Sequence, residues 1–322
     1  MSAGSDPRGS ASLIEAAGRE TLRERLARPR PMILDGATGT ELERAGLPTG
    51  LPLWSTHALL EAPETVRAIH AAQLEAGAEL ITANTFRTQE RTLARAGLDQ
   101  QDETLTRLAV GLASEAISAH RTRALAAPDA SGPPSLFVAG SLPPLEDCYR
   151  PDLVPDAPAL AHEHGRQAEL LADAGVDLSL IETMNTQREA AAAAAAAART
   201  GRPFAVSFVA DGPNRLLSGE PLLEAAGSVL ALGAVAVGLN CVPPSVLVAN
   251  AATLQRIEGP LLLAPNLGEP DGTTGFRRRE DVTPAAFARL LSSWRDEPRL
   301  RIVGGCCGTT PAHIAALANA FA

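Results

Sequence analysis

Residues 175–183 are Gly-Val-Asp-Leu-Ser-Leu-Ile-Glu-Thr. Gly175 follows an alanine- and leucine-rich segment with helical spacing, and glycine is the residue that most often ends an α-helix. The apolar run Leu178–Ile181 comes next, with the length and composition of a parallel strand buried on both faces. The polar residues Glu182 and Thr183 follow directly. This stretch therefore predicts a helix end, a buried strand and a polar strand end in immediate succession.

The same alternation recurs along the chain of 322 residues. Short apolar runs occur at Met32–Leu34, Glu79–Ala83, Leu136–Ala139, Leu178–Ile181, Phe204–Val209, Val235–Leu239, Leu261–Ala264 and Leu300–Val303. Helical patterns lie between them at Pro63–Glu75, Thr104–Ala119, Pro158–Ala174, Gln187–Arg199, Pro221–Ala231, Val246–Arg256 and Pro284–Trp294. Successive strand-then-helix units predict an α/β fold, a single (β/α)8 barrel of the TIM type. A doubly wound sheet is the alternative, but Asp35-Gly-Ala-Thr-Gly-Thr lacks the spacing of the dinucleotide-binding glycine motif.

Composition excludes several classes of protein. The net charge is −9 and no stripe of Lys or Arg occurs, so nucleic-acid binding is not expected. No apolar run reaches the roughly 18 residues of a membrane span. Four cysteines are too few for a secreted disulfide scaffold, so we expect a cytoplasmic protein. Residues 1–20, which begin with a Ser/Gly/Ala-rich segment, are predicted to be a flexible tail, and residues 21–322 the barrel domain.

Polar residues gather after the predicted strands, where barrel enzymes carry their chemistry. They are Asp35-Gly36, Asn84-Thr85, Gly140-Ser141, Glu182-Thr183, Asp211, Asn240-Cys241, Pro265-Asn266 and Gly305-Cys306-Cys307. The connections Ser141–Ala157 and Asn266–Arg279 are long and rich in Pro, Gly and Asp, so we expect both to lie over the mouth of the barrel. The six histidines fall on predicted helices or otherwise outside the strand ends.

Three of the four cysteines lie at predicted strand ends. Cys306 and Cys307 are adjacent, and the flanking glycines permit the sharp turn that would bring both sulfurs to one point. Cys241 ends the sixth strand, and the start of the last helix near Thr310 should favour thiolate. Three sulfur ligands suit Zn²⁺ and leave one coordination position open, as in catalytic sites. A redox pair usually has C-x-x-C spacing, which is absent, and Cys148 is expected to be an ordinary buried residue.

An open, sulfur-rich zinc site favours binding of a substrate thiol, whose pKa zinc would lower. Asp35 and Glu182 could hold the ammonium group of an amino acid, and the N–H groups of Gly36 and Ala37 its carboxylate. Local capping or turn roles remain the alternative for these carboxylates, and for Asn84, Thr85 and Asn240. A zinc hydrolase, or a zinc- or thiol-binding protein without enzymatic activity, are the rival classes.

Five motifs together resemble the homocysteine S-methyltransferase family. They are Asp35-Gly-Ala-Thr-Gly-Thr-Glu-Leu, Ala83-Asn-Thr-Phe, Ile181-Glu-Thr, Gly238-Leu-Asn-Cys-Val and Gly304-Gly-Cys-Cys-Gly-Thr-Thr-Pro, in family order from about Met32 to Ile314. The resemblance implies a (β/α)8 barrel with zinc held by Cys241, Cys306 and Cys307. It also implies homocysteine as methyl acceptor, methionine as product, and Asp35 and Glu182 as the residues that hold the amino acid.

The methyl donor is indicated by the branch of the family. The betaine-using branch has an aromatic residue after the Glu, where this chain has Thr183, and a Tyr in the second-strand motif, where Phe86 and Arg87 stand. The chain is similar to the stand-alone branch that uses S-methylmethionine or S-adenosylmethionine. Trp54 fits the Leu-Trp of that branch, and its ring could meet a sulfonium methyl, although a packing role is the alternative. A betaine or other donor and a selenol acceptor remain open.

Overall fold

Eight parallel strands form a ring at the centre of the molecule. The structure, a computed structural model, describes residues 20–126, 134–271, 275–279 and 281–322. The strands are β1 (Met32–Ile33), β2 (Leu80–Ala83), β3 (Phe137–Leu142), β4 (Leu178–Met184), β5 (Phe204–Phe208), β8 (Val237–Asn240), β9 (Leu261–Ala264) and β12 (Leu300–Val303). Their order is β1-β12-β9-β8-β5-β4-β3-β2, and a parallel bridge between Leu34 and Leu80 joins the two ends. The predicted (β/α)8 barrel is confirmed, and every predicted run overlaps a strand.

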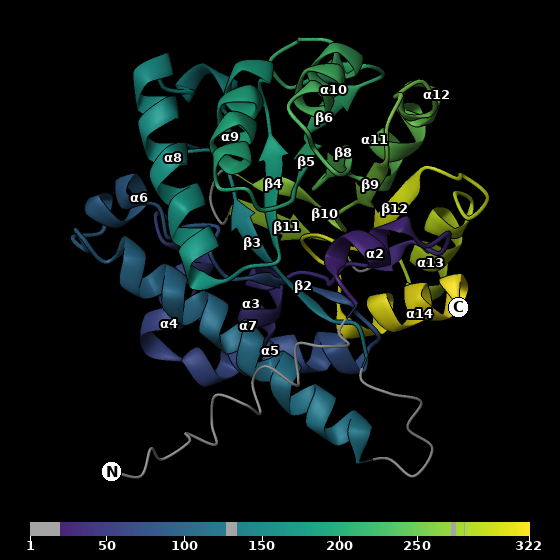
Figure 1. The fold of residues 1–322 in the computed structure, drawn as a ribbon, viewed down its shortest axis with the longest axis horizontal. Coiled ribbons are helices and arrows are strands. Elements are labelled where there is room, and N and C mark those ends of the chain that lie inside the picture. Colours follow the sequence, from purple (N-terminus) through teal and green to yellow (C-terminus); the bar gives the residue numbers. More distant parts are fainter. Residues whose placement is uncertain (1–19, 127–133, 272–274, 280) are drawn as a thin grey trace, which may run out of the picture.

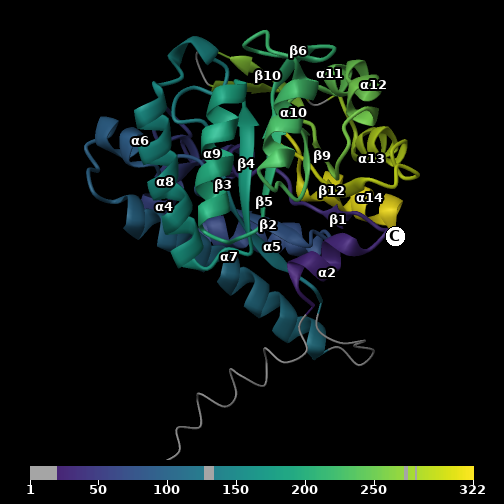
Figure 2. The same cartoon turned by 45° about the horizontal axis from the view of Figure 1, so that its top comes forward.

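Helices surround this ring (Figures 1 and 2). They are α2 (Leu22–Ala27), α3 (Gly39–Arg44), α4 (His57–Glu61), α5 (Pro63–Glu75), α6 (Glu90–Arg95), α7 (Asp102–Leu125), α8 (Ala157–Ala174), α9 (Gln187–Arg199), α10 (Leu222–Ala231), α11 (Pro244–Ala249), α12 (Ala251–Gln255), α13 (Pro284–Ser292) and α14 (Pro311–Phe321). Short 3-10 helices occur at η1 (Trp54–Thr56) and η2 (Pro151–Leu153), and hairpins at β6 (Ala210–Gly212) with β7 (Arg215–Leu216) and β10 (Gly268–Asp271) with β11 (Gly275–Arg278). All six histidines lie on helices, outside the strand ends as predicted.

The strands are apolar on both sides because each side is buried against a different layer. Met32 and Leu34 pack inside the barrel with Leu180 and Leu262, whereas Ile33, between them in sequence, packs among the residues that the helices cover. Successive residues of a strand point to opposite faces, so one short run supplies both layers. This double burial explains why the strands are continuous apolar runs rather than alternating patterns.

One predicted helix is divided in two. The segment Val246–Arg256 forms α11 and α12, which meet at Asn250. The buried Asn250 side chain donates to the carbonyls of Gly212 and Val246 at 3.1 and 3.0 Å and accepts the N–H of Asn214 at 2.8 Å. An asparagine that bonds to a neighbouring hairpin competes with regular helical geometry. The prediction of one continuous helix was wrong for this reason.

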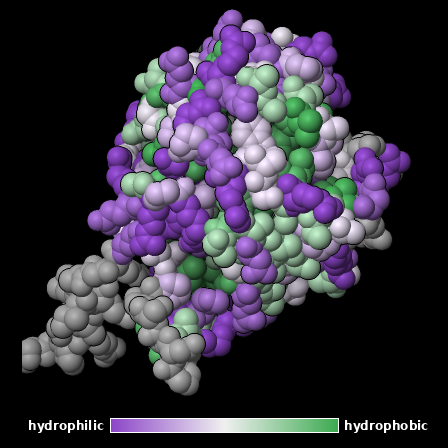
Figure 3. All heavy atoms as spheres, turned by 90° about the vertical axis from the view of Figure 1, so that its right-hand side faces the viewer, coloured by the Kyte–Doolittle hydropathy of each residue, from purple (hydrophilic) through white to green (hydrophobic). Residues whose placement is uncertain are grey.

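Helix α2 lies near the end of the barrel where the strands begin, and Arg25 anchors it. The Arg25 guanidinium is 1% exposed and donates to both Glu79 oxygens at 3.0 and 2.7 Å. Residues 1–20, the predicted tail, lie outside the described residues except for Glu20. On the face in Figure 3, hydrophilic residues are interspersed with smaller apolar areas. None of the helices in the described part of the chain is long and apolar enough to span a membrane.

Candidate active site

A cavity of about 500 Å³ opens at the carboxyl ends of the barrel strands. This size falls in the range of roughly 300–1,000 Å³ found for small-molecule sites. The strand-end residues Asp35, Asn84, Glu182 and Asn240 line it, together with Cys241, Cys306 and Cys307. Residues 147–150 of the connection after β3 also line it, so the predicted position of that loop over the mouth is confirmed. The other long connection, Asn266–Arg279, forms the hairpin β10–β11.

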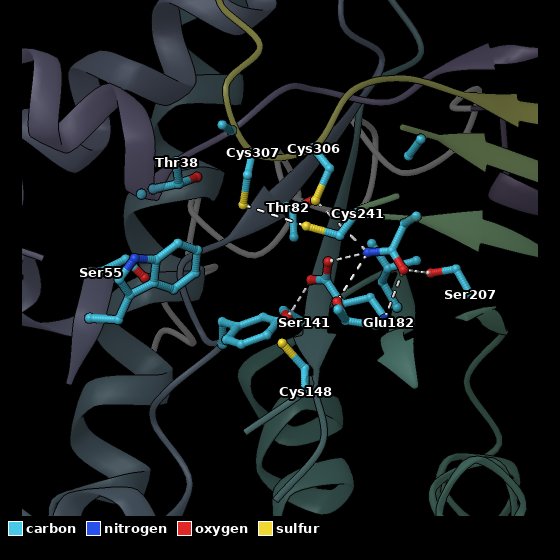
Figure 4. Close-up of a pocket in the computed structure, with 18 of the residues that line it drawn as sticks. Thr38, Ser55, Thr82, Ser141, Cys148, Glu182, Ser207, Cys241, Cys306 and Cys307 are labelled. Atoms are coloured by element: carbon cyan, nitrogen blue, oxygen red, sulfur yellow. Dashed lines mark hydrogen bonds between the residues drawn. The ribbon is translucent and has the colours of Figure 1, made fainter. Parts of the chain in front are cut away.

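The three predicted cysteines converge on one point. Their sulfurs lie within 4.8 Å of one another, and those of Cys241 and Cys307 are 3.6 Å apart. Figure 4 shows the side chains of Cys306 and Cys307 descending from one loop toward Cys241. Such a group could hold a metal ion. Cys148 is buried, as predicted, but it also lines the cavity, and it lies apart from this group of three (Figure 4).

Unusual backbone conformations bring these sulfurs together. Cys241 has a φ of +52°, in the left-handed region that a side chain usually avoids. Gly308 has a φ of +84°, and a Cβ there would lie 2.4 Å from the Leu267 carbonyl oxygen. The turn is held by hydrogen bonds from Cys306 N–H to the Pro265 carbonyl and from Leu267 N–H to the Cys307 carbonyl, at 3.0 and 2.7 Å. The predicted sharp turn at the cysteine pair is confirmed.

Hydrogen bonds from neighbouring side chains stabilise negative charge on the Cys241 sulfur, whereas the same contacts with Cys241 raise the pKa values of Cys306 and Cys307. The thiols of Cys306 and Cys307, and then the Tyr149 hydroxyl at 3.6 Å, lower the pKa of Cys241 well below its usual value. The Asn240 amide lies 4.0 Å from the Cys306 sulfur. At the start of the last helix, Thr310 N–H donates to His313 Nδ1 at 3.2 Å and not to a sulfur. Partners of this second layer orient ligands and tune a metal site.

Asp35 is held by the neighbouring strand. Its carboxylate oxygens accept the Thr82 N–H and the Thr82 hydroxyl, both at 2.8 Å. Asp35 is 2% exposed, and this burial raises its pKa to about 7 against the effect of those hydrogen bonds. A carboxyl group poised near neutrality in a cavity is typical of a functional site.

Glu182 belongs to a hydrogen-bond network centred on Asn240. Glu182 Oε1 accepts the Ser141 hydroxyl at 2.6 Å, and Oε2 accepts the Asn240 amide at 3.1 Å. Asn240 Oδ1 in turn accepts the Thr183 N–H and the Ser207 hydroxyl, both at 2.8 Å. Burial is the main cause that raises the pKa of Glu182 to about 8. Thr183 has a φ of +62°, a strained conformation for a β-branched residue that this network stabilises.

Of the remaining residues predicted to bind substrate, some line the cavity and one does not. Gly36, Ala37 and Trp54 line the cavity, although the Ala37 N–H already donates to Thr309 Oγ1 at 3.2 Å. Trp54 packs so closely on Gly39 that a Cβ there would lie 2.5 Å from its ring. Thr85 is not among the lining residues.

The Thr85 hydroxyl donates instead to the Ser141 carbonyl at 2.9 Å, in the buried layer behind the cavity wall. Asp211 also lies outside the cavity wall, because it extends into the hairpin β6–β7 and pairs with Arg215. Both strand-end residues were correctly located in sequence, but their side chains do not reach the site.

Several lining residues were not predicted. Thr82 and Ser207 lie inside strands. Ser141 was predicted at a strand end and does line the cavity, although it lies inside β3, which extends to Leu142. Tyr149 was missed as a site residue although it is the only tyrosine in the chain and lies in the loop predicted to cover the mouth. Arg87, one residue beyond Phe86, was likewise noted only as standing where a tyrosine was expected.

The fold and this set of side chains define a methyltransferase with a three-cysteine centre, and the chain belongs to the homocysteine S-methyltransferase family. The sequence profile of that family matches residues 32–321. The chain is 34% identical over 314 residues to homocysteine S-methyltransferase of Escherichia coli K12, covering 92% of this chain and 97% of that protein. It is 31% identical over 314 residues to selenocysteine methyltransferase of Astragalus bisulcatus, with 88% and 90% covered.

The structure is also similar to a solved member of the family. The metallated form of the homocysteine methyltransferase MmuM from Escherichia coli superimposes with a TM-score of 0.79 at 30% identity, covering 92% of this chain and 99% of that one. The apo form superimposes with a TM-score of 0.71 at 28% identity. The family relationship therefore extends over the whole barrel and is not limited to the cysteine motifs.

Proposed function

We propose that this enzyme is a zinc-dependent S-methyltransferase whose barrel domain comprises residues 21–322. It moves a methyl group from a sulfonium donor to homocysteine and produces methionine. The observation that carries the proposal is the convergence of three thiols and the carboxyl groups of Asp35 and Glu182 on one cavity. The names of the E. coli and A. bisulcatus relatives support a thiol or selenol acceptor. S-Methylmethionine or S-adenosylmethionine is the proposed donor.

The donor set fits zinc. Tetrahedral zinc with Zn–S distances of about 2.3 Å places two sulfur ligands about 3.8 Å apart. The sulfurs of Cys241 and Cys307 are 3.6 Å apart. Three protein ligands leave one position open to the cavity, and soft sulfur ligands disfavour magnesium and calcium. Zinc held there would lower the pKa of a substrate thiol and hold its sulfur in place.

Asp35 and Glu182 are suited to bind the ammonium group of homocysteine. Asp35 is buried and Glu182 is partly buried, and the negative charge of Asp35 further raises the pKa of Glu182. A cation between two such groups offsets both their desolvation and their mutual repulsion. Asn240 and Ser141 fix the orientation of Glu182, while Thr82 fixes that of Asp35. The backbone at Gly36 and Ala37 would meet the substrate carboxylate.

The reaction needs no nucleophile from the protein. The acceptor thiol releases its proton to solvent, and its sulfur forms a bond to the donor methyl carbon. The bond from that carbon to the donor sulfur breaks, its electron pair stays on that sulfur, and the sulfonium becomes a neutral thioether. The protein contributes by aligning the two sulfurs and the methyl carbon. Trp54 lines the cavity where its ring would face the sulfonium.

The free thiols also indicate the cellular compartment in which the enzyme acts. The structure has all four cysteines unpaired, and three of them must stay reduced to bind zinc. The cytoplasm keeps thiols in that state. We therefore place the enzyme in the cytoplasm, acting in methionine formation on small-molecule substrates.

The decisive experiment combines a donor assay with a cysteine variant. Purified protein is incubated with homocysteine and either S-methylmethionine, S-adenosylmethionine or betaine, and methionine is measured. We expect methionine from a sulfonium donor, with S-methylmethionine the best. Cys306→Ser should lose bound zinc and activity, whereas Cys148→Ser, matched in chemistry but outside the three-sulfur group, should keep its zinc.

The rival classes predict other results. A zinc hydrolase would cleave simple esters or amides without forming methionine, and a binding protein would retain zinc without methyl transfer from any donor. Full zinc content and full activity in Cys306→Ser would contradict the proposed role of the three cysteines. Selenocysteine as an alternative acceptor, suggested by the A. bisulcatus relative, is tested by replacing homocysteine with selenocysteine and measuring Se-methylselenocysteine.

A further inference from the structure

Arg87 is a buried cation in the cavity wall that forms no ion pair among the residues that the structure describes. Its side chain lines the cavity and is only 9% exposed. It donates one hydrogen bond, from Nη1 to the Glu146 carbonyl at 3.2 Å, and its guanidinium carbon lies 5.2 Å from the centre of the Phe86 ring. Its Nε has no partner. Among the residues the structure describes, no carboxylate lies within ion-pair distance of Arg87.

This arrangement is costly, and the neighbouring arginines show that it is avoidable. Arg91 pairs with Glu146 and Glu163, and Arg95 pairs with Glu146. Both are more exposed than Arg87, so the most buried of the three is the one that lacks a carboxylate. Burial of a charge without a partner is strongly unfavourable. Desolvation lowers the pKa of Arg87, and the more distant negative charges of Asp147 and Glu146 offset this effect only in part. A cation held in this state in a cavity wall indicates that a ligand anion completes its coordination.

The surroundings of Arg87 differ from those of the two carboxyl groups. Asp35 and Glu182 accept hydrogen bonds from Thr82, Ser141 and Asn240, whereas the hydrogen bond of Arg87 goes to Glu146. Arg87 lies instead against Phe86, whose ring meets the Trp54 ring edge-on at 5.5 Å. It also lies against the loop after β3, where the exposed Asp147 lines the cavity. This part of the cavity therefore combines aromatic surface, a guanidinium and an acidic residue.

That combination matches a sulfonium amino acid. Aromatic faces attract a sulfonium cation, and the guanidinium is the side chain best suited to bind a carboxylate through paired hydrogen bonds. We propose that Arg87 binds the carboxylate of the methyl donor, which selects a sulfonium that carries an amino-acid carboxylate over a sulfonium that lacks one. The inference rests on the proposed methyl transfer, because it assigns the second substrate of that reaction to this part of the cavity.

A binding experiment tests this without requiring the reaction to occur. Zinc-loaded protein, without homocysteine, is titrated calorimetrically with S-methylmethionine and with (3-aminopropyl)dimethylsulfonium, which has the same sulfonium and ammonium groups but no carboxylate. Hydrogen bonds to a charged group are worth about 10- to 100-fold in affinity, so the wild type should prefer S-methylmethionine by that factor. Arg87→Gln should lose this preference, with little change for the carboxylate-free compound.

Two controls separate recognition from loop anchoring. Arg95→Gln removes a contact to Glu146 of the same loop but leaves Arg87 in place, and it should keep the preference. Arg87→Lys keeps the charge without the planar fork, and we expect an intermediate preference. In steady-state kinetics, Arg87→Gln should raise the KM for the donor, while the KM for homocysteine and the melting temperature stay close to wild type.

Several outcomes would overturn the inference. The first is equal affinity of the wild type for the two sulfonium compounds. This outcome is measured on the wild-type protein alone and so does not depend on whether a variant folds. Equal weakening of both compounds, or of homocysteine, in Arg87→Gln would show that Arg87 only holds the loop. If methionine is never formed but the Arg87-dependent preference persists, the proposed function fails and the carboxylate site stands. If methionine is formed but the wild type shows no preference for the compound with a carboxylate, the proposed function stands and the carboxylate site at Arg87 fails.

Discussion

The side-chain amide of Asn240 donates to Glu182 Oε2 at 3.1 Å. Asn240 directly precedes Cys241 at the end of β8, so this bond links the thiol cluster to a carboxylate on another strand. The same amide lies 4.0 Å from the Cys306 sulfur. One side chain therefore links the cysteine cluster to Glu182, the group proposed to bind the ammonium of the methyl acceptor.

Asn240→Ala tests this coupling. The substitution leaves the Glu182 oxygen and the Thr183 N–H without a buried partner, and loss of such second-layer contacts typically costs about 10- to 100-fold in metal affinity or activity. We expect kcat/KM for homocysteine to fall by that factor, and zinc content after dialysis to fall with it. Ser228→Ala on α10, whose hydroxyl donates only to its own helix at Ala225, is the control. Unchanged kinetics in Asn240→Ala would contradict the coupling.

The raised pKa values of Asp35 and Glu182, about 7 and about 8, predict a pH dependence of amino-acid binding. Methionine is a suitable probe because it has the ammonium group but no thiol to titrate. Only the ionised carboxyls attract that group, so affinity should increase from pH 6 to pH 8, by about tenfold per pH unit for each carboxyl that must ionise. The number of protons released on binding, measured by calorimetry in two buffers, gives the number of carboxyl groups that ionise.

The same two groups affect stability with the opposite trend. Their pKa values are higher in the folded state than in the unfolded chain, so the folded protein holds protons that the unfolded chain has lost. Stability without ligand should therefore decrease as the pH rises from about 4 to about 8. Asp35→Asn removes one of the two titrating groups, so both the methionine affinity and the stability should depend less on pH up to about pH 7. A pH-independent affinity for methionine would show that neither carboxyl pairs with the ammonium.

Gly308 is predicted to be essential for the geometry of the cysteine turn. Ala at this position would combine a left-handed backbone with a Cβ 2.4 Å from the Leu267 carbonyl oxygen, so the turn that carries Cys307 must move. We expect Gly308→Ala to lose zinc affinity by at least about tenfold. Gly175→Ala is the matched control, because its φ is +91° but a Cβ there meets nothing within 4 Å.

The Gly175→Ala variant should be destabilised by only about 1–2 kcal/mol, the cost of the left-handed backbone, with zinc affinity unchanged. Zinc titration with a competing chelator measures the affinity, and urea unfolding measures the stability. Equal zinc affinities in the two variants would mean that the turn tolerates a Cβ at position 308.

Arg25 is expected to matter for stability and not for the site. Its guanidinium is buried and pairs with Glu79, which is partly buried and also pairs with Arg30, so loss of the Arg25 hydrogen bonds should cost about 1–3 kcal/mol. Arg25→Ala should lower the free energy of unfolding in urea by that amount, with the KM values unchanged. Arg67→Ala breaks an exposed pair with Glu64 and should change stability by no more than about 0.5 kcal/mol. A similar loss in both variants would contradict the importance of burial.

The eight strands, most of the helices and the three cysteines were predicted from the sequence because the signals are local. Apolar runs of a few residues and glycines such as Gly77 and Gly175 report on neighbouring backbone only. Asn250 was missed as a helix break because its partners lie in a hairpin nearly 40 residues earlier.

The cysteine triad could be predicted for a further reason, which is that the barrel topology brings the ends of all its strands to one face. Residues distant in sequence but placed at strand ends must then meet, whatever the details of their packing. Position in the barrel does not decide where a side chain points. Thr85 and Asp211 follow strands as predicted, yet they turn away from the cavity.

The sequence by itself determined which residues reach the active end of this protein, because strand and helix periodicity is encoded in short segments. Only the tertiary structure decided how those residues are partnered. Thr82 orients Asp35, Ser141 and Asn240 orient Glu182, and Arg87 has no carboxylate beside it, although Glu146 is near. These facts depend on side chains from different strands and loops meeting at distances of about 3 Å, at which hydrogen bonds form or fail to form.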